Sequence, residues 1–239
     1  MQLTRETTVG EIAAAEPASM RVFEALGIDY CCGGKRALAD ACSRAGVSVD
    51  EVKARIAQAG RTVHAFTPTR WAESQLSDLI DHIAERHHAF VRSEAARIEV
   101  LLEKVIARHG AAHPEIAQIR DLFAAACEEL MTHMMKEEHV LFPYIARMEQ
   151  AANAGEPRPP AFFGSIEAPI AQMVADHDDA GALLAKMNQL AGGYAPPEDA
   201  CATFRALYQA LARFELDLHE HVHLENNILF PRALVFERG

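Results

Sequence analysis

The sequence predicts an all-α protein in which a small helical domain precedes a bundle of four long antiparallel helices. Alanine is abundant and aromatic residues make up only 7% of the 239 residues, a composition that favours helix over sheet. Long stretches lack glycine and proline. In the second part of the chain, apolar residues recur at steps of three and four, the pattern of packed helical bundles.

The first 62 residues contain short helical segments with clear start and stop signals, and we assign them to the small domain. Thr8 or Glu11 opens the first helix and Pro17 ends it. The remaining segments are a helix closed by Gly27, a turn at 29–35, a helix stopped by Gly46 and a helix from 48 to about 60. Residues 63–74 lack periodicity and are predicted to be a linker.

Residues 75–239 are predicted to form the four-helix bundle. The four expected helices cover about 76–109, 114–150, 165–190 and 197–235. Pro143 and Pro231 should kink or restart the second and fourth helices near their ends, because proline cannot continue the helical hydrogen bonds.

Two stretches of the bundle repeat one pattern. HMMKEEHVLFP begins at His133 and HVHLENNILFP begins at His221, and both read His-x-x-x-Glu followed by an apolar run and Leu-Phe-Pro. A spacing of four puts the histidine and the glutamate on one helix face, within the apolar stripe. A lone histidine there is usually a hydrogen-bonded core residue, but a buried carboxylate without a partner is costly.

Each of the four apolar stripes is interrupted by a histidine. His88 precedes His133 by 45 residues and His177 precedes His221 by 44, so the chain reads as two similar helical hairpins. The six candidate metal ligands are His88, His133, Glu137, His177, His221 and Glu225. Four imidazoles and two carboxylates on facing helices suit two metal ions bridged by the glutamates. Nitrogen and oxygen donors favour iron over soft metals, and are also compatible with manganese or zinc.

Two further histidines compete for the position on the first bundle helix. His87 lies on a different apolar stripe from His88, and periodicity alone does not choose between them, although the matching intervals favour His88. His109 lies on the same face as His88 but about 31 Å along an unbroken helix. We therefore exclude His109 from the expected ligand set.

Charge and composition narrow the possible partners and compartment. The net charge of −11 disfavours nucleic acid and anionic membranes as partners, and no apolar run reaches the length of a membrane span. The N-terminus lacks the pattern of a secretion signal. Five cysteines, an odd number, are more typical of the reducing cytoplasm than of a disulfide framework.

The motifs HMMKEE…LFP, DHDDAG, HVHLENNILFP and the early DYCCGGK together resemble the iron–sulfur cluster repair di-iron proteins, over essentially the whole chain. The resemblance implies a hemerythrin-like bundle and an N-terminal domain carrying a Cys-Cys pair. It implies two irons bound by the four histidines named above, with His88 and not His87 on the first helix, and bridged by Glu137 and Glu225. It further implies repair of damaged iron–sulfur proteins under nitric oxide or peroxide stress.

Cys31 and Cys32 are the candidate redox or iron-transfer residues. They precede Gly33-Gly34 and an expected helix, whose backbone N–H groups, with Lys35 and Arg36, would favour thiolates. The simpler interpretation is a pair of small buried residues at a tight turn. Iron donation and nitric oxide removal both fit the resemblance; the rivals are a nitric oxide reductase and an oxygen or nitric oxide binding protein. The sequence is compatible with a monomer or a homodimer.

Overall fold

The computed structural model describes residues 3–62 and 71–238, and the regular structure within these ranges is helical. The pairing of Thr8 with Ala37 is an isolated β-bridge. Contacts divide the chain into two compact units. The first comprises Met1–Ile80, Met148–Pro159 and His219–Gly239, and the second comprises Asp81–Arg147 and Pro160–Leu218. The predicted all-α class is confirmed.

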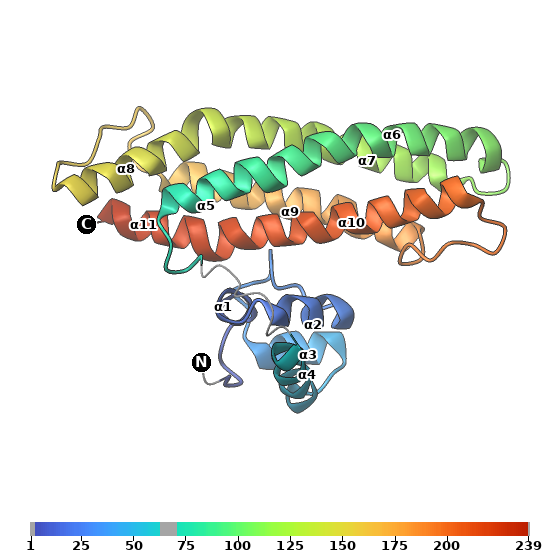
Figure 1. Ribbon diagram of the computed structural model, residues 1–239, viewed down its shortest axis with the longest axis horizontal. Coiled ribbons are helices and arrows are strands. Elements are labelled where there is room, and N and C mark those ends of the chain that lie inside the picture. The colour runs from blue at the N-terminus through green and yellow to red at the C-terminus, as the bar shows by residue number, and fades with distance from the viewer. Residues whose placement is uncertain (1–2, 63–70, 239) are drawn as a thin grey trace. The chain divides into compact units, whose positions relative to one another are not determined.

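The N-terminal part of the first unit consists of four short helices, which are α1 (Val9–Ala15), α2 (Ala18–Leu26), α3 (Leu38–Ala45) and α4 (Val49–Thr62) (Figure 1). Thr8 and Glu11 form a capping box at the start of α1, where each side chain accepts a hydrogen bond from the other's backbone N–H. Gly27 and Gly46 end α2 and α3 with left-handed φ angles of 64° and 69°. These boundaries agree with the start and stop signals of the sequence.

A small apolar core holds these helices together. Its fully buried members include Ile12 of α1, Phe23 of α2, Leu38 of α3 and Val52 of α4. Of the predicted linker 63–74, residues 63–70 lie outside the described part of the chain, and 71–74 form a turn before α5 (Leu76–His82).

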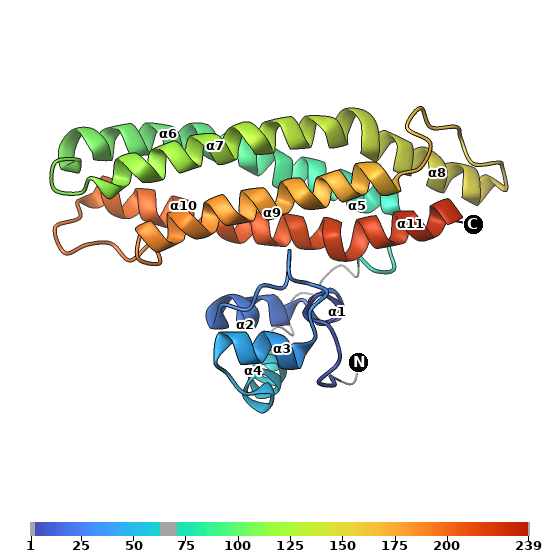
Figure 2. The same cartoon turned by 180° about the vertical axis from the view of Figure 1, so that it is seen from behind.

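The second unit contains the main stretches of four long helices, which lie alongside one another in both views (Figures 1 and 2). They are α6 (Ala89–His109), α7 (Glu115–Lys136), α9 (Glu167–Leu190) and α10 (Ala202–Leu224). Phe214 of α10 packs against Phe90 of α6 and Phe123 of α7, with ring centroids 6.5 and 5.3 Å apart. These three rings therefore form one apolar contact that links α6, α7 and α10.

The fourth bundle helix begins later than predicted, at Ala202 and not near Pro197. The backbone N–H of Ala200 bonds to the carbonyl of Pro197 at 3.0 Å, so residues 197–200 form a turn. From Ala202, α10 extends to Leu224.

Three segments with π-helical hydrogen bonding lie within the long helices, and the sequence did not predict them. They are η1 (Ile83–His88) between α5 and α6, η2 (Glu137–Leu141) between α7 and α8 (Phe142–Ala154), and η3 (Glu225–Leu229) between α10 and α11 (Phe230–Arg238). Pro143 and Pro231 are the second residues of α8 and α11, so α-helix restarts at both prolines as expected.

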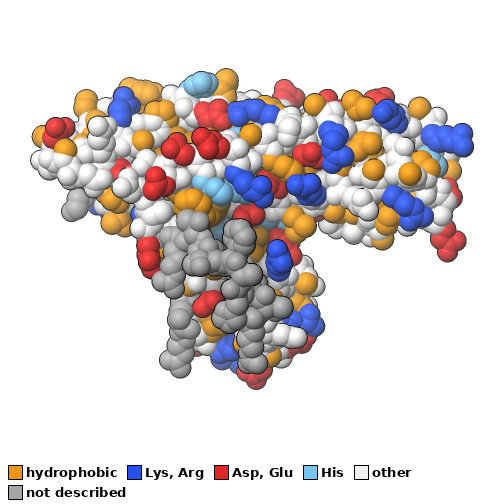
Figure 3. Space-filling view, in the orientation of Figure 1, with side chains coloured by type: hydrophobic (Ala, Val, Ile, Leu, Met, Phe, Trp, Pro, Cys, Tyr) orange, Lys and Arg blue, Asp and Glu red, His pale blue; other side chains and the backbone are white. Residues whose placement is uncertain are grey.

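The surface carries both signs of charge. On the face shown in Figure 3, basic and acidic side chains are interspersed over the helical bundle. Within residues 3–62 and 71–238, no helix has both the length and the apolar character that crossing a bilayer requires.

Candidate metal centre

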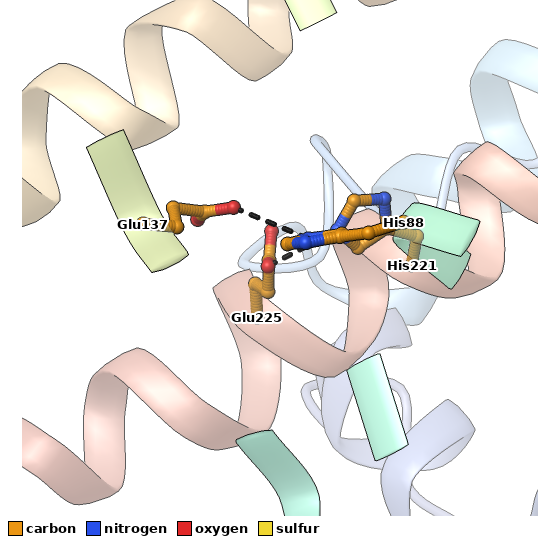
Figure 4. Close-up of side chains that lie close together, drawn as sticks. All are labelled: His88, Glu137, His221 and Glu225. Carbon is orange, nitrogen blue, oxygen red and sulfur yellow. Dashed lines mark hydrogen bonds and ion pairs between the residues drawn. The ribbon is translucent and has the colours of Figure 1, made fainter. Parts of the chain in front are cut away.

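The structure brings all six predicted side chains together in two overlapping groups. His88, Glu137, His221 and Glu225 each offer a donor atom within 4.8 Å of the others (Figure 4), and so do His133, Glu137, His177 and Glu225. All six residues are buried. The two glutamates belong to both groups, while each histidine belongs to one.

Glu137 is the most informative member of the cluster. Its side chain is 0% exposed, and neither carboxylate oxygen accepts a hydrogen bond from any residue that the structure describes. Oε2 lies 3.4 Å from Nε2 of His88, and Oε1 lies 3.3 Å from Nε2 of His133. Burying a carboxylate without a hydrogen-bond donor costs on the order of several kcal/mol, because a charge loses its hydration without gaining a partner. A cation between these groups removes that cost, so the residues fit a metal.

The imidazoles present the same ring nitrogen to the cluster. Nε2 of His133 and Nε2 of His177 are 3.0 Å apart, so the two rings face each other through nitrogens that can bind a metal. Nε2 of His221 lies 3.1 Å from Oε1 of Glu225. Converging nitrogen and oxygen donors without thiolate are the ligand set of borderline metals such as iron, manganese or zinc.

The outward ring nitrogens are fixed by two further carboxylates. Nδ1 of His88 lies 2.7 Å from Oε1 of Glu138, and Nδ1 of His133 lies 3.4 Å from Oδ2 of Asp176. Such bonds set the tautomer and orientation of metal-binding histidines. Arg92 also binds Glu138, and Lys136 and Gln172 bind Asp176.

The pKa values of both carboxyls lie below their ordinary range. Burial alone would raise the pKa of Glu138, but hydrogen bonds from His88 and Arg92 outweigh it. At Asp176 burial is likewise outweighed, here by hydrogen bonds from Gln172, Lys136 and His133. Both groups are therefore charged at neutral pH, and each can hold the proton of a neutral imidazole on Nδ1.

Each π segment begins or ends at a residue of the cluster. Glu137 is the first residue of η2, Glu225 is the first of η3, and His88 is the last of η1. The N–H of Phe142 bonds to the carbonyl of Glu137, and that of Phe230 bonds to the carbonyl of Glu225, each reaching back five residues. This widened turn changes the direction in which the glutamates project, and π segments of this kind are frequent at functional sites.

His87 and His109 have partners outside the cluster. His87 is fully buried, and its Nδ1 lies 3.1 Å from Oδ2 of Asp217, one turn before His221 on α10. His109, at the other end of α6, has its Nε2 3.2 Å from Sγ of Cys201. Sequence reasoning missed Glu138, Asp176 and Asp217. Their positions offered a signal, because Glu138 and Asp176 are each next to a candidate ligand and Asp217 lies four residues before His221.

The cysteine pair differs from expectation. Residues 32–35 form a turn and α3 begins only at Leu38, so no helix start lies beside the pair. Cys31 is buried, and its N–H and Sγ contact Oδ1 of Asp29 at 3.2 and 3.4 Å. A hydrogen bond with Cys32, together with burial, raises the pKa of Cys31 well above its ordinary value. The prediction that the local structure favours a thiolate is therefore wrong for Cys31.

Comparison with known proteins agrees with this architecture. Residues 78–233 match the hemerythrin HHE cation binding domain, and residues 5–60 match a domain of unknown function, DUF542. The iron–sulfur cluster repair protein YtfE of Pectobacterium carotovorum is 37% identical over 230 residues, covering 96% of this chain and 97% of that protein.

Two more relatives carry the same name and the same coverage of both chains. The iron–sulfur cluster repair protein YtfE of Musicola paradisiaca is 37% identical over 236 residues, and that of Yersinia pseudotuberculosis is 35% identical over 230 residues. The family resemblance inferred from the motifs is thereby confirmed. Along the chain a small N-terminal domain is followed by a metal-binding helical bundle, and the protein belongs to the iron–sulfur cluster repair protein family.

Proposed function

We propose that the protein repairs iron–sulfur clusters damaged by nitrosative or oxidative stress, using two iron ions held by the bundle. The observation that carries the proposal is Glu137, a fully buried carboxylate with one oxygen toward His88 and the other toward His133. A carboxylate that faces two donor groups in this way is suited to join two cations.

The roles of the side chains follow from the two groups. His88 and His221 would bind one iron, and His133 and His177 the other, with Glu137 and Glu225 bridging both. Glu138 and Asp176 would keep the imidazoles of His88 and His133 neutral and oriented. The bound irons would supply one-electron chemistry and open positions for small ligands such as nitric oxide or O2.

The N-terminal domain would add thiol chemistry to the bundle. We propose that Cys31 and Cys32 take part in redox or iron transfer, with damaged iron–sulfur proteins as the partners. Cys31 would remain a thiol until iron binds its sulfur and the displaced proton passes to water, because Cys32 and burial disfavour its thiolate. We further propose that the protein acts in the reducing cytoplasm, where its five cysteines would stay reduced, as a monomer or a homodimer.

An iron-transfer assay tests this function against its rivals. The reduced, iron-loaded protein is mixed with an apo-protein that needs an iron–sulfur cluster, and separately with nitric oxide or O2. Iron appearing in the acceptor, together with recovered activity of a nitric oxide-damaged enzyme, supports repair.

Two other results would favour the rival functions. Nitrous oxide formed over many turnovers, without iron transfer, would identify a nitric oxide reductase. Reversible O2 binding, without either reaction, would identify a hemerythrin-like carrier or sensor, a protein with no need of the thiol pair.

A further inference from the structure

A second reactive arrangement lies at the opposite end of α6 from the metal centre. His109, the last residue of α6, places Nε2 3.2 Å from Sγ of Cys201, which precedes the first residue of α10. The two residues are 92 positions apart in the sequence, so the fold creates the pair. Along the continuous α6, His109 is about 31 Å from His88, which separates this pair from the metal centre.

The sulfur of Cys201 is both accessible and activated. Cys201 is exposed, and backbone N–H groups of Phe204 and Thr203, at the start of the 23-residue α10, point at its Sγ. The N–H of Phe204, followed by the imidazole of His109, lowers the pKa of Cys201 to about 7. About half of the side chains are then thiolate at neutral pH, and the thiolate is the nucleophilic form of cysteine.

The other cysteines provide a contrast within the same chain. Cys31, Cys42 and Cys127 are buried, and Cys32 is partly buried. Burial, with a smaller contribution from Glu99, raises the pKa of Cys127 to about 12. Exposure and activation thus coincide at Cys201, whereas Cys127 of the same bundle lacks both.

The imidazole is held in place by its neighbours. The ring of His109 packs against Phe204 of α10, with centroids 5.4 Å apart, and against His113, at 6.4 Å. Glu115 and Asp199 lie 2.9 and 3.1 Å from the ring nitrogens of the neighbouring His113. These two carboxylates pair with His113, whereas the ring of His109 contacts the sulfur of Cys201.

We propose that Cys201 is a hydroperoxide-reactive thiol and that His109 is its proton partner. The thiolate attacks one oxygen of a hydroperoxide, so that an S–O bond forms as the O–O bond breaks. Sulfur loses two electrons and the peroxide gains them. The departing hydroxide or alkoxide takes the proton from Nε2 of His109, which leaves a sulfenic acid on Cys201 and a water or alcohol. This oxidation site does not depend on the metal centre.

The test uses the full-length protein and hydrogen peroxide. Sulfenic acid is trapped with dimedone, and each cysteine is quantified by peptide mass spectrometry. We expect Cys201 to be trapped at least ten times faster than Cys127 at pH 7. The rate of Cys201 alkylation by iodoacetamide should rise with a midpoint near pH 7. A midpoint at or above the ordinary value of about 8.5, or equal trapping of Cys201 and Cys127, would overturn the proposal.

Substitution of the histidine tests the pairing. His109→Gln should slow the trapping of Cys201 several-fold at pH 7 and move its alkylation midpoint upward. His113→Gln removes a neighbouring imidazole that is bonded to Glu115 and Asp199, and should change the rate less than twofold. Slow labelling of Cys127 reports that the bundle of each variant is intact. An unchanged rate in an intact His109→Gln variant would show that His109 is not the proton partner.

Discussion

Glu137 is a buried carboxylate that faces His88 and His133, and replacing it with its amide distinguishes an effect on folding from an effect on metal binding. Glu137→Gln removes a buried charge from the metal-free protein, so we expect its free energy of unfolding to rise by about 1–3 kcal/mol. The same change should lower the stability of the iron-loaded protein, because the amide is a poor bridging ligand. Thermal unfolding with and without a chelator measures both effects.

The control for this substitution is Glu128→Gln, which changes an exposed glutamate of α7, the helix that η2 follows. It should alter stability by less than about 0.5 kcal/mol in either form. Destabilisation of the metal-free Glu137→Gln protein would mean that Glu137 is satisfied without metal, contrary to the proposed bridging role.

The histidines of the first bundle helix give a second test at this scale. His88→Ala should lower the iron content because the variant loses a donor from the cluster. His109→Ala should leave the iron content unchanged, because His109 pairs with Cys201 at the other end of α6. Metal analysis of the two purified variants measures their iron content. Loss of an iron ligand from a folded His109 variant would contradict the assignment of His88, and not His109, as the ligand.

The crossing of α6, α7 and α10 at Phe214 gives a prediction at the scale of the helices. Phe214→Ala should lower the free energy of unfolding by about 3–5 kcal/mol, because the ring is fully buried against Phe90 and Phe123. Leu216 of the same helix is 48% exposed, so Leu216→Ala should cost far less. Denaturant unfolding of the two variants provides the comparison, and similar losses would place Phe214 outside the core.

Helix boundaries show which elements can be read from a sequence. Glycine and capping residues act locally, and the ends at Gly27 and Gly46 were predicted for that reason. The start of α10 was predicted too early because Pro197 opens a turn and not the helix. The segments η1, η2 and η3 were missed, since one extra residue in a turn barely disturbs an apolar periodicity of three and four.

The candidate site likewise contains residues that the sequence predicted and residues that it did not. The six clustered residues were predicted because each repeats at a fixed interval within an apolar stripe. Glu138 and Asp176 could not be told from ordinary surface carboxylates, because their role depends on which way His88 and His133 turn their Nδ1 atoms. The pair of His109 and Cys201 depends on a contact between residues 92 positions apart, which no local pattern reveals.

At the scale of the whole molecule, the proposed function assigns separate tasks to the two domains. Replacing Cys31 and Cys32 with serine should leave the iron content unchanged, because the bundle supplies all six clustered side chains. The same change should impair recovery of a nitric oxide-damaged iron–sulfur enzyme, compared with wild type at equal iron loading. A matched variant is Cys42→Ser, which alters another buried thiol of the N-terminal domain. Equal recovery by all three proteins would make the pair structural.

The most direct test of the metal centre is iron analysis combined with Mössbauer spectroscopy of the full-length protein. We predict two irons per chain with the magnetic coupling of a bridged pair. Glu137→Ala and Glu225→Ala should each lose iron or lose the coupling, since each carboxylate belongs to both groups of donors. A single uncoupled iron in the wild-type protein, or an unchanged coupled signal in both variants, would contradict the bridged two-iron centre.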